Sequence, residues 1–339
     1  MFTSNRLILC LVFLLSVVAV KAQSNLLNAS SPEQIQELEE QQEQLDDSKP
    51  LPYGYIDKRD IMWSKIVWEQ IDLNQKINYP LLYPLDSNRL GEDRRSLFQV
   101  LIDGIKKGAE DPDAKGAITD VYATSYFQQK KTYEEIVNSL KAIFLPDIAL
   151  DILGQYGVAG TDNVQLFLNR ALAGELENYP DLYSAELISQ MKPYVIPTEI
   201  TGADITAYLI KGIWYFDKRQ GQLKYRLIGI APAGYDIQTQ NPTFSGDPKV
   251  IPYFWVWFKD AREALHDAKV LNSKNAASPL TFDHLLNSRR FDAVIYKTQN
   301  VYEDREIENY VQENALMQLL EAKRVSDEIR NFELDMWTY

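Results

Sequence analysis

The sequence has two histidines, His266 and His284, the residue type best suited to proton transfer or metal binding near neutral pH. Each lies in a segment that we predict to be helical. Neither has a second histidine four residues away, and no His-Glu-x-x-His stretch occurs, so the spacing argues against a metal site. A Ser–His–Asp triad stays open, although the sequence contains no Gly-x-Ser-x-Gly elbow.

The stretch DPDAKGAITDVY begins at Asp111 like a calcium-binding loop, with Asp113 and Gly116 in suitable places. Its twelfth position is Tyr122, where such a loop needs a bidentate glutamate, so we interpret it as a surface loop. The sequence also contains no glycine-rich phosphate loop and no dinucleotide-binding fingerprint. These observations predict no metal and no cofactor, and they favour a binding or assembly protein over an enzyme.

The composition is that of an acidic globular protein. The chain has 339 residues, of which 45% are hydrophobic, so it can form a sizeable core. Its 48 acidic and 35 basic residues give a net charge of −13. Such a charge repels phosphate backbones and anionic lipid headgroups, which argues against nucleic acid and membrane surfaces as partners.

The first 22 residues have the features of a secretory signal peptide. Arg6 supplies the positive charge, residues 7–20 are apolar, and Ala22 precedes the expected cleavage position. An uncleaved anchor is the alternative. The only cysteine, Cys10, lies inside this segment without the small residues of a lipoprotein signal before it. The processed chain is therefore expected to have no membrane span, no disulfide and no catalytic thiol.

Residues 23–52 are rich in Gln, Glu, Ser and Pro and contain few apolar residues. We interpret them as an acidic, solvated tether; a helix that docks on a partner is the alternative.

Two later stretches, residues 66–84 and 212–232, resemble each other. Each begins near a tryptophan, Trp68 or Trp214, continues through an aspartate and a polar turn, and ends in an apolar run closed by proline. We interpret them as a duplicated strand–helix–strand unit, with chance resemblance as the alternative. This interpretation predicts a first half at residues 53–200, with a helical middle segment, and a second half at residues 201–302.

The second half predicts an antiparallel sheet. Two strand-like runs, KGIWYF and KYRLIGIAP, flank a short turn with glycine at residues 218–221, which is typical of a hairpin. In the middle segment, Thr132 and Glu135 stand in the spacing of a capping box at the start of a helix. The predicted fold class is therefore α+β, with helices packed on antiparallel sheet units.

The run IPYFWVWF at residues 251–258 has no polar face if it forms one strand. Alternation would put Tyr253, Trp255 and Trp257 on one face, and Phe254, Val256 and Phe258 on the other. One face can be covered by the chain's own helices around Leu97 and Leu285. We expect the other face to be covered within the same domain, as in layered folds. Alternatively, Tyr253, Trp255 and Trp257 form a protein interface, where Trp and Tyr are favoured.

The C-terminal region, residues 303–339, predicts one long helix over residues 306–337. Apolar residues recur every three or four positions, and neither Gly nor Pro interrupts them. The members of this apolar stripe are Ile307, Val311, Ala315, Leu319, Ala322, Val325, Ile329, Phe332 and Met336.

Several long segments together resemble the GldN family, whose members are also called PorN. They include RDIMWSKIVWEQIDLNQKINYPLLYP, RRSLFQVL, WYFDKRQGQLKYRLIGIAP and LLEAKRVSDEIRNFELDMWTY. The longest is YFWVWFKDAREALHDAKVLNSKNAASPLTFDHLLNSRRFDAVIYKTQNVYEDREI. The resemblance covers residues 55–339 apart from residues 145–193.

This resemblance implies a periplasmic structural subunit of the type IX secretion system, which also powers gliding motility in some bacteria. It implies a ring of many copies, held at the outer membrane by a GldK- or PorK-like lipoprotein. It also implies contact with the periplasmic region of a GldM- or PorM-like motor protein. No catalysis is expected; an exported enzyme or ligand-binding protein is the alternative.

Overall fold

Long antiparallel strands form the centre of the structure, a computed structural model that describes residues 50–85, 94–241, 245–246, 248–270, 280–301, 303–312 and 314–337. The predicted signal peptide and nearly all of the predicted tether lie outside these residues. The strands, in chain order, are β1 (Ile61–Asp72), β2 (Val121–Tyr122), β3 (Lys141–Ala142), β4 (Thr198–Glu199), β5 (Ile205–Asp217), β6 (Gln222–Tyr235), β7 (Val250–Pro252), β8 (Trp255–Trp257), β9 (Lys269–Val270), β10 (Leu280–Thr281) and β11 (Val294–Thr298).

Helices of very different length connect these strands. The α-helices are α3 (Tyr79–Leu82), α4 (Leu97–Glu110), α5 (Tyr133–Ser139), α6 (Asp147–Gln155), α7 (Thr161–Ala173), α8 (Ala185–Met191), α9 (Phe258–Asp267), α10 (Phe282–Asn287), α11 (Ile307–Tyr310) and α12 (Ala315–Trp337). Short 3-10 helices are η3 (Lys58–Asp60), η4 (Lys76–Asn78), η6 (Leu176–Asn178), η7 (Gly202–Asp204) and η8 (Ile237–Gln240). The predicted α+β class, with antiparallel strands and a C-terminal helix, is confirmed.

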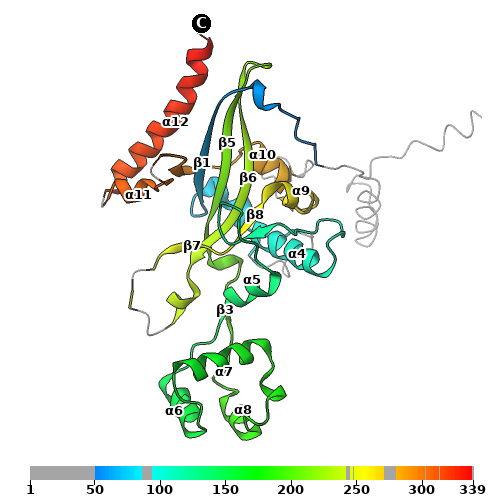
Figure 1. Ribbon diagram of the computed structural model, residues 1–339, viewed down its shortest axis with the longest axis vertical. Helices are drawn as coiled ribbons and strands as arrows, with labels where there is room; N and C mark the ends of the chain where they lie inside the picture. The colour runs from blue at the N-terminus through cyan, green and yellow to red at the C-terminus, as the bar shows by residue number, and fades with distance from the viewer. Residues whose placement is uncertain are drawn as a thin grey trace, which may run out of the picture. The chain divides into compact units, whose positions relative to one another are not determined.

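Among the described residues, seven strands join one sheet in the order β11-β1-β5-β6-β8-β2, with β7 paired to β6. All neighbouring strands of this sheet, in the described residues, pair antiparallel. The predicted hairpin is confirmed: β5 and β6 are joined by residues 218–221, and Gly221 has φ 62°, which glycine adopts at no steric cost. Figure 1 shows β1, β5 and β6 running side by side as the longest strands.

The boundary predicted at residues 200 and 201 does not separate two compact halves. β1 comes from the first predicted half, yet it pairs with β5 and β11 from the second. β2 of the first half likewise pairs with β8 of the second. Because strands of both halves interleave in one sheet, Pro50–Tyr339 forms a single compact unit.

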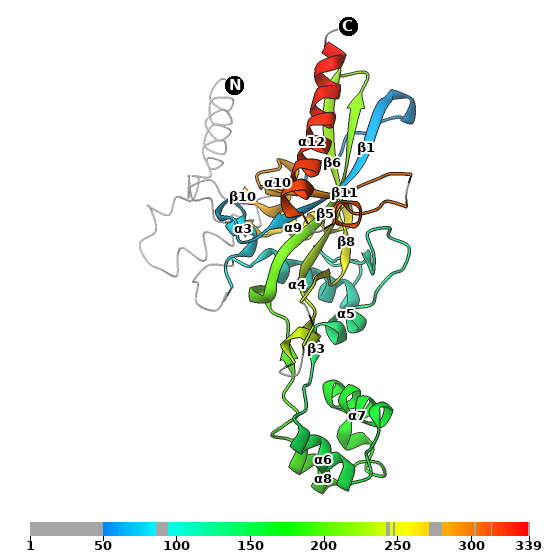
Figure 2. The same ribbon diagram turned by 90° about the vertical axis from the view of Figure 1, so that its left-hand side faces the viewer.

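The main core packs helices α4, α9 and α10 against one face of this sheet. It contains Leu97 and Phe98 of α4, Phe258 of α9 and Leu285 of α10, each at most 5% exposed. The Ser96 hydroxyl accepts a hydrogen bond from the Gln99 backbone N–H at 3.3 Å and begins α4. Figure 2 shows α4, α9 and β8 in the same part of the structure.

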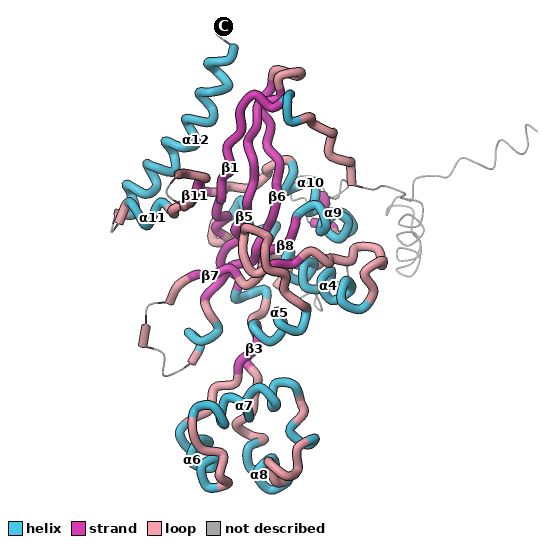
Figure 3. Tube along the Cα trace, viewed as in Figure 1, coloured by secondary structure: helices cyan, strands magenta, loops and turns pink. Residues whose placement is uncertain are grey.

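A separate group of helices, α6, α7 and α8, has its own small core (Figure 3). Phe167 and Tyr183 meet edge to face at 5.3 Å between ring centroids, and Leu153, Leu187 and Met191 are fully buried around them. The chain enters and leaves this group through the antiparallel pair of β3 and β4. Just before it, the capping box predicted at Thr132 and Glu135 is confirmed at the start of α5.

The predicted C-terminal helix is wrong in one respect: it is two helices, α11 and α12, rather than one. The Asn314 side chain accepts a hydrogen bond from the backbone N–H of Met317 at 3.0 Å, which is an N-cap contact. The side-chain amide of Gln318 donates a hydrogen bond to the carbonyl of Val311, the C-cap residue of α11, at 2.8 Å. These local side-chain contacts satisfy backbone groups that an unbroken helix would have used, so the helix stops and restarts without Gly or Pro.

Candidate interaction surfaces

The residues that could perform chemistry do not form a metal site. His266 lies in α9, and His284 lies in the first turn of α10, where its backbone N–H donates to the Thr281 hydroxyl. Asp111 ends α4 and accepts a hydrogen bond from the backbone N–H of Asp113 at 3.1 Å, which is a local turn. Within the described ranges, no group of three His, Cys, Asp or Glu side chains is placed to hold a metal ion.

A buried ion pair joins β1 to the loop after α10. The guanidinium of Arg289 donates two hydrogen bonds to the Glu69 carboxylate, at 2.8 and 2.9 Å, and Tyr225 donates a third at 3.3 Å. Burial, with the Glu69 charge adding to it, holds the pKa of Tyr225 well above its usual range. Because both carboxylate oxygens are occupied, this cluster is suited to joining strands rather than to moving protons.

A second buried pair, Arg262 with Asp283, joins α9 to α10 at 2.8 Å. The ring of Tyr53 lies 4.3 Å from the Arg262 guanidinium, and its hydroxyl donates to the side chain of Asn287 at 2.7 Å. Burial is the main cause that raises the pKa of Tyr53 to about 12. The contacts fix Tyr53 onto α9 and α10.

The aromatic run is not one strand, because β8 comprises only Trp255–Trp257 and Phe258 begins α9. Tyr253 and Phe254 precede β8 and both belong to the main core, so the predicted sharing of a face by Tyr253 and Trp255 is wrong. Tyr253 is 6% exposed and donates its hydroxyl to the backbone carbonyl of Tyr235 at 2.7 Å. The predicted covering of Val256 by helices around Leu97 and Leu285 is confirmed.

The chain itself covers the opposite face of β8. Trp255 is 2% exposed and packs with Trp68 and Ala231, while Phe127 reaches it from the loop after β2. The Phe127 ring also meets the ring of Trp257 edge to face, at 4.9 Å between centroids. Tyr253 and Trp255 therefore contribute to the chain's own core. Contact of the half-buried Trp257 with another protein stays a prediction.

A glycine makes room for this covering loop. A Cβ atom added to Gly229 of β6 would lie 2.4 Å from the ring of Phe127, closer than real contacts allow. Phe127 itself adopts φ 56°, a left-handed conformation that is unusual for an aromatic residue. The position of Phe127 thus depends on a residue about one hundred positions later in the chain.

The inner face of α12 packs on the same side of β1 that carries Trp63 and Val67. Ala322, Val325 and Ile329 are buried, at 5%, 3% and 4% exposed. Phe332, one turn further, stacks on Trp63 at 4.7 Å between ring centroids. These contacts confirm the second half of the predicted apolar stripe, whereas Leu319, in its first half, is 53% exposed.

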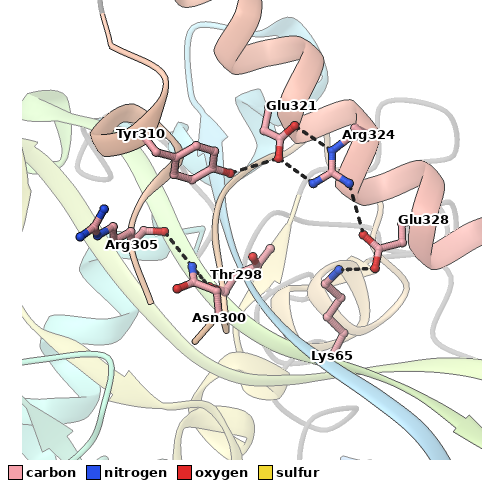
Figure 4. A network of polar contacts seen from close by, with 8 residues as sticks. All are labelled: Lys65, Thr298, Asn300, Arg305, Tyr310, Glu321, Arg324 and Glu328. Carbon is pink, nitrogen blue, oxygen red and sulfur yellow. Dashed lines mark hydrogen bonds and ion pairs between the residues drawn. The ribbon is translucent and has the colours of Figure 1, made fainter. Parts of the chain in front are cut away.

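A polar network also attaches α12 to its surroundings (Figure 4). Arg324 donates to both oxygens of Glu321, at 2.7 and 2.8 Å, and Tyr310 of α11 donates to the same carboxylate at 3.3 Å. Glu328 forms an ion pair with Lys65 of β1 at 2.9 Å. The hydrogen bonds from Arg324 lower the pKa of Glu321, so this carboxylate keeps its charge at a lower pH than an ordinary glutamate does.

The outer face of α12 is apolar at its beginning. We use the name helix patch for Leu316, Met317, Leu319 and Leu320, whose exposed fractions are 66%, 51%, 53% and 51%. Single exposed leucines are ordinary on a protein surface, but four within five residues are not. The helix patch is therefore a candidate surface for protein–protein contact. The sequence signal was present, because Leu319 belongs to the predicted stripe and Leu316, Met317 and Leu320 are apolar positions beside it.

A second apolar surface lies around α3. We use the name tyrosine patch for Ile77, Tyr79, Tyr83 and Leu85, which are 57%, 40%, 51% and 47% exposed. The rings of Tyr79 and Tyr83 meet edge to face at 5.6 Å between centroids. Tyrosine is favoured in interfaces because it combines a large apolar area with a hydroxyl.

A groove of about 560 Å³ runs between α12 and the sheet, lined in part by Trp214, Arg289 and Arg330. Its arginines are already engaged, Arg289 by Glu69 and Arg330 by Asp327 at 2.9 Å. These two guanidinium groups are therefore less available to a ligand than the lining residues alone would indicate.

The described part of the chain is thus an α+β body with two exposed apolar patches, which are candidate surfaces for protein–protein contact. The chain belongs to the GldN family of gliding motility associated proteins, whose family model matches residues 56–338. The predicted membership is thus confirmed, over a range that includes residues 145–193. No curated protein matches the chain. In the part of the chain that the structure describes, no helix is long and apolar enough to cross a membrane.

Proposed function

We propose that this chain is a non-catalytic structural subunit of the type IX secretion and gliding machinery. In this proposal it lies in the periplasm and assembles into a ring with a GldK- or PorK-like lipoprotein of the outer membrane. The periplasmic region of a GldM- or PorM-like motor protein is its second partner. Membership of the GldN family, whose members are described as gliding motility associated, supports this assignment.

The observation that carries the proposal is the helix patch. Its four side chains are each at least half exposed, although the same helix buries Ala322, Val325 and Ile329 only one or two turns later. Burying apolar area contributes roughly 25 cal/mol per Å² of favourable free energy, so a complex in which a partner covers this patch is stabilised. A subunit built for assembly needs such a surface, whereas an independent exported enzyme does not.

The periplasmic location rests on the predicted signal peptide at residues 1–22. N-terminal sequencing of the protein from the periplasmic fraction tests it, and the proposal predicts a chain that begins at Gln23. A chain that retains Met1, or one that carries a lipid on Cys10, would contradict a soluble periplasmic subunit.

Co-purification with the lipoprotein tests the assembly role. The tagged chain and the lipoprotein, co-expressed and then separated by size, should elute together as a complex larger than either protein alone. A chain that stays monomeric and does not bind the lipoprotein would favour the alternative, an exported enzyme or ligand-binding protein. In that case the groove beside Arg289 would be the first site to examine.

The two patches provide a matched pair of variants for the same experiment. Tyr83→Ala removes a large side chain from the tyrosine patch, and Leu320→Ser removes one from the helix patch. Both residues are about half exposed, so neither change should cost more than about 0.5 kcal/mol of folding stability. Loss of the lipoprotein in only one variant identifies the surface that binds it.

A further inference from the structure

We propose that α12 pairs with α12 of a second copy of this chain, in antiparallel orientation and centred on the level of residue 325. This inference rests on the proposed assembly role and names the partner that covers the outer face of α12. It is carried by the spacing, the exposure and the charges of the residues along that face.

The outer face of α12 carries a continuous stripe with the spacing of a coiled coil. Its positions follow one another at intervals of four, three, four, three and four residues, which keeps them on one side of a helix. The stripe consists of Leu316, Leu320, Lys323, Asp327, Arg330 and Leu334.

The members of this stripe lie outside the buried face of α12, although Lys323 and Arg330 also line the groove between α12 and the sheet. Leu316, Leu320 and Leu334 are 66%, 51% and 57% exposed. The side chains of Asp327 and Arg330 are 38% and 67% exposed, and Lys323 is exposed as well. The buried residues Ala322, Val325 and Ile329 lie on the opposite side, against the sheet. Each member of the stripe therefore keeps an exposed part that a helix of another molecule can contact.

The stripe is complementary to itself when two copies run in opposite directions. Leu316 and Leu334 are equally far from residue 325, so Leu316 of each copy meets Leu334 of the other copy. Lys323 and Asp327 are also symmetric about residue 325, so each ammonium group meets a carboxylate of the second copy, twice over. The apolar ends exclude water from these two central ion pairs, which strengthens them.

The remaining layer fits the same register. Leu320 meets Arg330 of the second copy, whose long aliphatic stem can cover the leucine while its guanidinium stays at the edge. In this chain that guanidinium already bonds Asp327 at 2.9 Å, so it lies beside the central carboxylate. Arg324, close to the two-fold axis, is neutralised by Glu321 at 2.7 Å and faces Glu328 at 3.8 Å.

The same charges disfavour the parallel arrangement. Two parallel helices in register would place Lys323 against Lys323 and Asp327 against Asp327. Like charges in direct contact across an interface cost binding free energy, which is how coiled coils select orientation. The order of charges along α12 therefore selects the antiparallel pair.

Charge exchange at the centre of the stripe tests the proposal. Sedimentation equilibrium of the full processed chain should show a concentration-dependent dimer. Lys323→Asp and Asp327→Lys should each weaken the dimer at least about tenfold, since each places like charges in both central layers. The double variant Lys323→Asp with Asp327→Lys restores opposite charges in both layers and should recover wild-type self-association. Lys106→Asp, an exposed lysine of α4, is the matched control and should leave the dimer unchanged.

Urea melts test whether each variant is folded. Substitutions at these exposed positions should change the free energy of unfolding by at most about 0.5 kcal/mol. A wild-type chain that is monomeric at every concentration would overturn the proposal, as would a double variant that stays as weak as the single ones. If the chain binds the lipoprotein in either case, the inference fails while the proposed function stands. A third outcome is a wild-type chain that never dimerises and a Lys323→Asp variant that no longer binds the lipoprotein. In that case the exposed face of α12 binds the lipoprotein, and the proposed pairing is wrong.

Discussion

Trp255 in β8 is 2% exposed, whereas Leu316 in α12 is 66% exposed. The aromatic run around Trp255 has the greater density of large apolar side chains, yet the chain covers both of its faces: α4, α9 and α10 on one side, and Phe127 and Trp68 on the other. The weaker, spaced pattern of α12 is covered on one side only. Apolar density in the sequence therefore marks core in this protein, whereas the helix with apolar residues on two sides keeps one apolar side exposed.

The largest expected effect comes from the covered region. Trp255→Ala should lower the free energy of unfolding by about 3–5 kcal/mol, because it leaves a cavity beside Trp68. Self-association and lipoprotein binding of the remaining folded protein should be unchanged, as measured by urea melts and sedimentation. Wild-type stability combined with lost binding would instead make Trp255 an interface residue and reverse the comparison. Trp257→Ala, at the half-buried end of β8, tests the interface prediction that remains.

A smaller effect tests how the covering loop is held. Gly229→Ala forces a methyl group into the Phe127 ring, which should cost about 1–3 kcal/mol. The matched control is Gly154→Ala in α6, where an added Cβ has no neighbour within 4 Å. That change should be neutral or stabilising by up to about 1 kcal/mol. Equal effects of the two changes would mean that Phe127 does not seal β8.

The smallest effect concerns the uncovered region. Asn314→Ala removes the N-cap of α12 and should cost about 1 kcal/mol, together with some helical circular dichroism signal. Asn331→Ala, at an exposed position inside α12, is the control and should change stability by at most about 0.5 kcal/mol. If the Asn314 variant keeps full stability, tertiary packing alone determines where α12 begins.

The elements that the sequence predicts well are those specified by neighbouring residues. The turn at residues 218–221 and the capping box of Thr132 are examples, because a few adjacent side chains determine each one. The break before α12 was also local, but the expectation relied on Gly and Pro and overlooked Asn314 as a cap.

What the sequence could not predict depends on contacts between distant residues. The pairing of β1 with β5 and β11 interleaves the predicted halves, and no local pattern encodes it. The cover over Trp255 comes from Phe127, which lies in an otherwise polar loop. For the candidate surfaces, periodicity located α12 correctly, but only the packed structure shows which of its two apolar sides remains exposed.

Site-specific cross-linking of α12 tests the central claim most directly. The only cysteine, Cys10, lies in the predicted signal peptide, so single cysteines introduced into the processed chain have no competitor. Leu316→Cys and Leu334→Cys lie 18 residues apart, roughly 27 Å along the helix, which is too far for a bond within one chain. In the antiparallel pair, the two positions meet across the interface.

The account predicts a disulfide-linked dimer when the Leu316→Cys and Leu334→Cys chains are mixed and oxidised, and monomers when either is oxidised alone. Ser64→Cys, an exposed position on β1, is the control and should stay monomeric in every mixture. Dimers formed by Leu316→Cys alone, or no dimer in the mixture, would contradict the antiparallel pairing of α12.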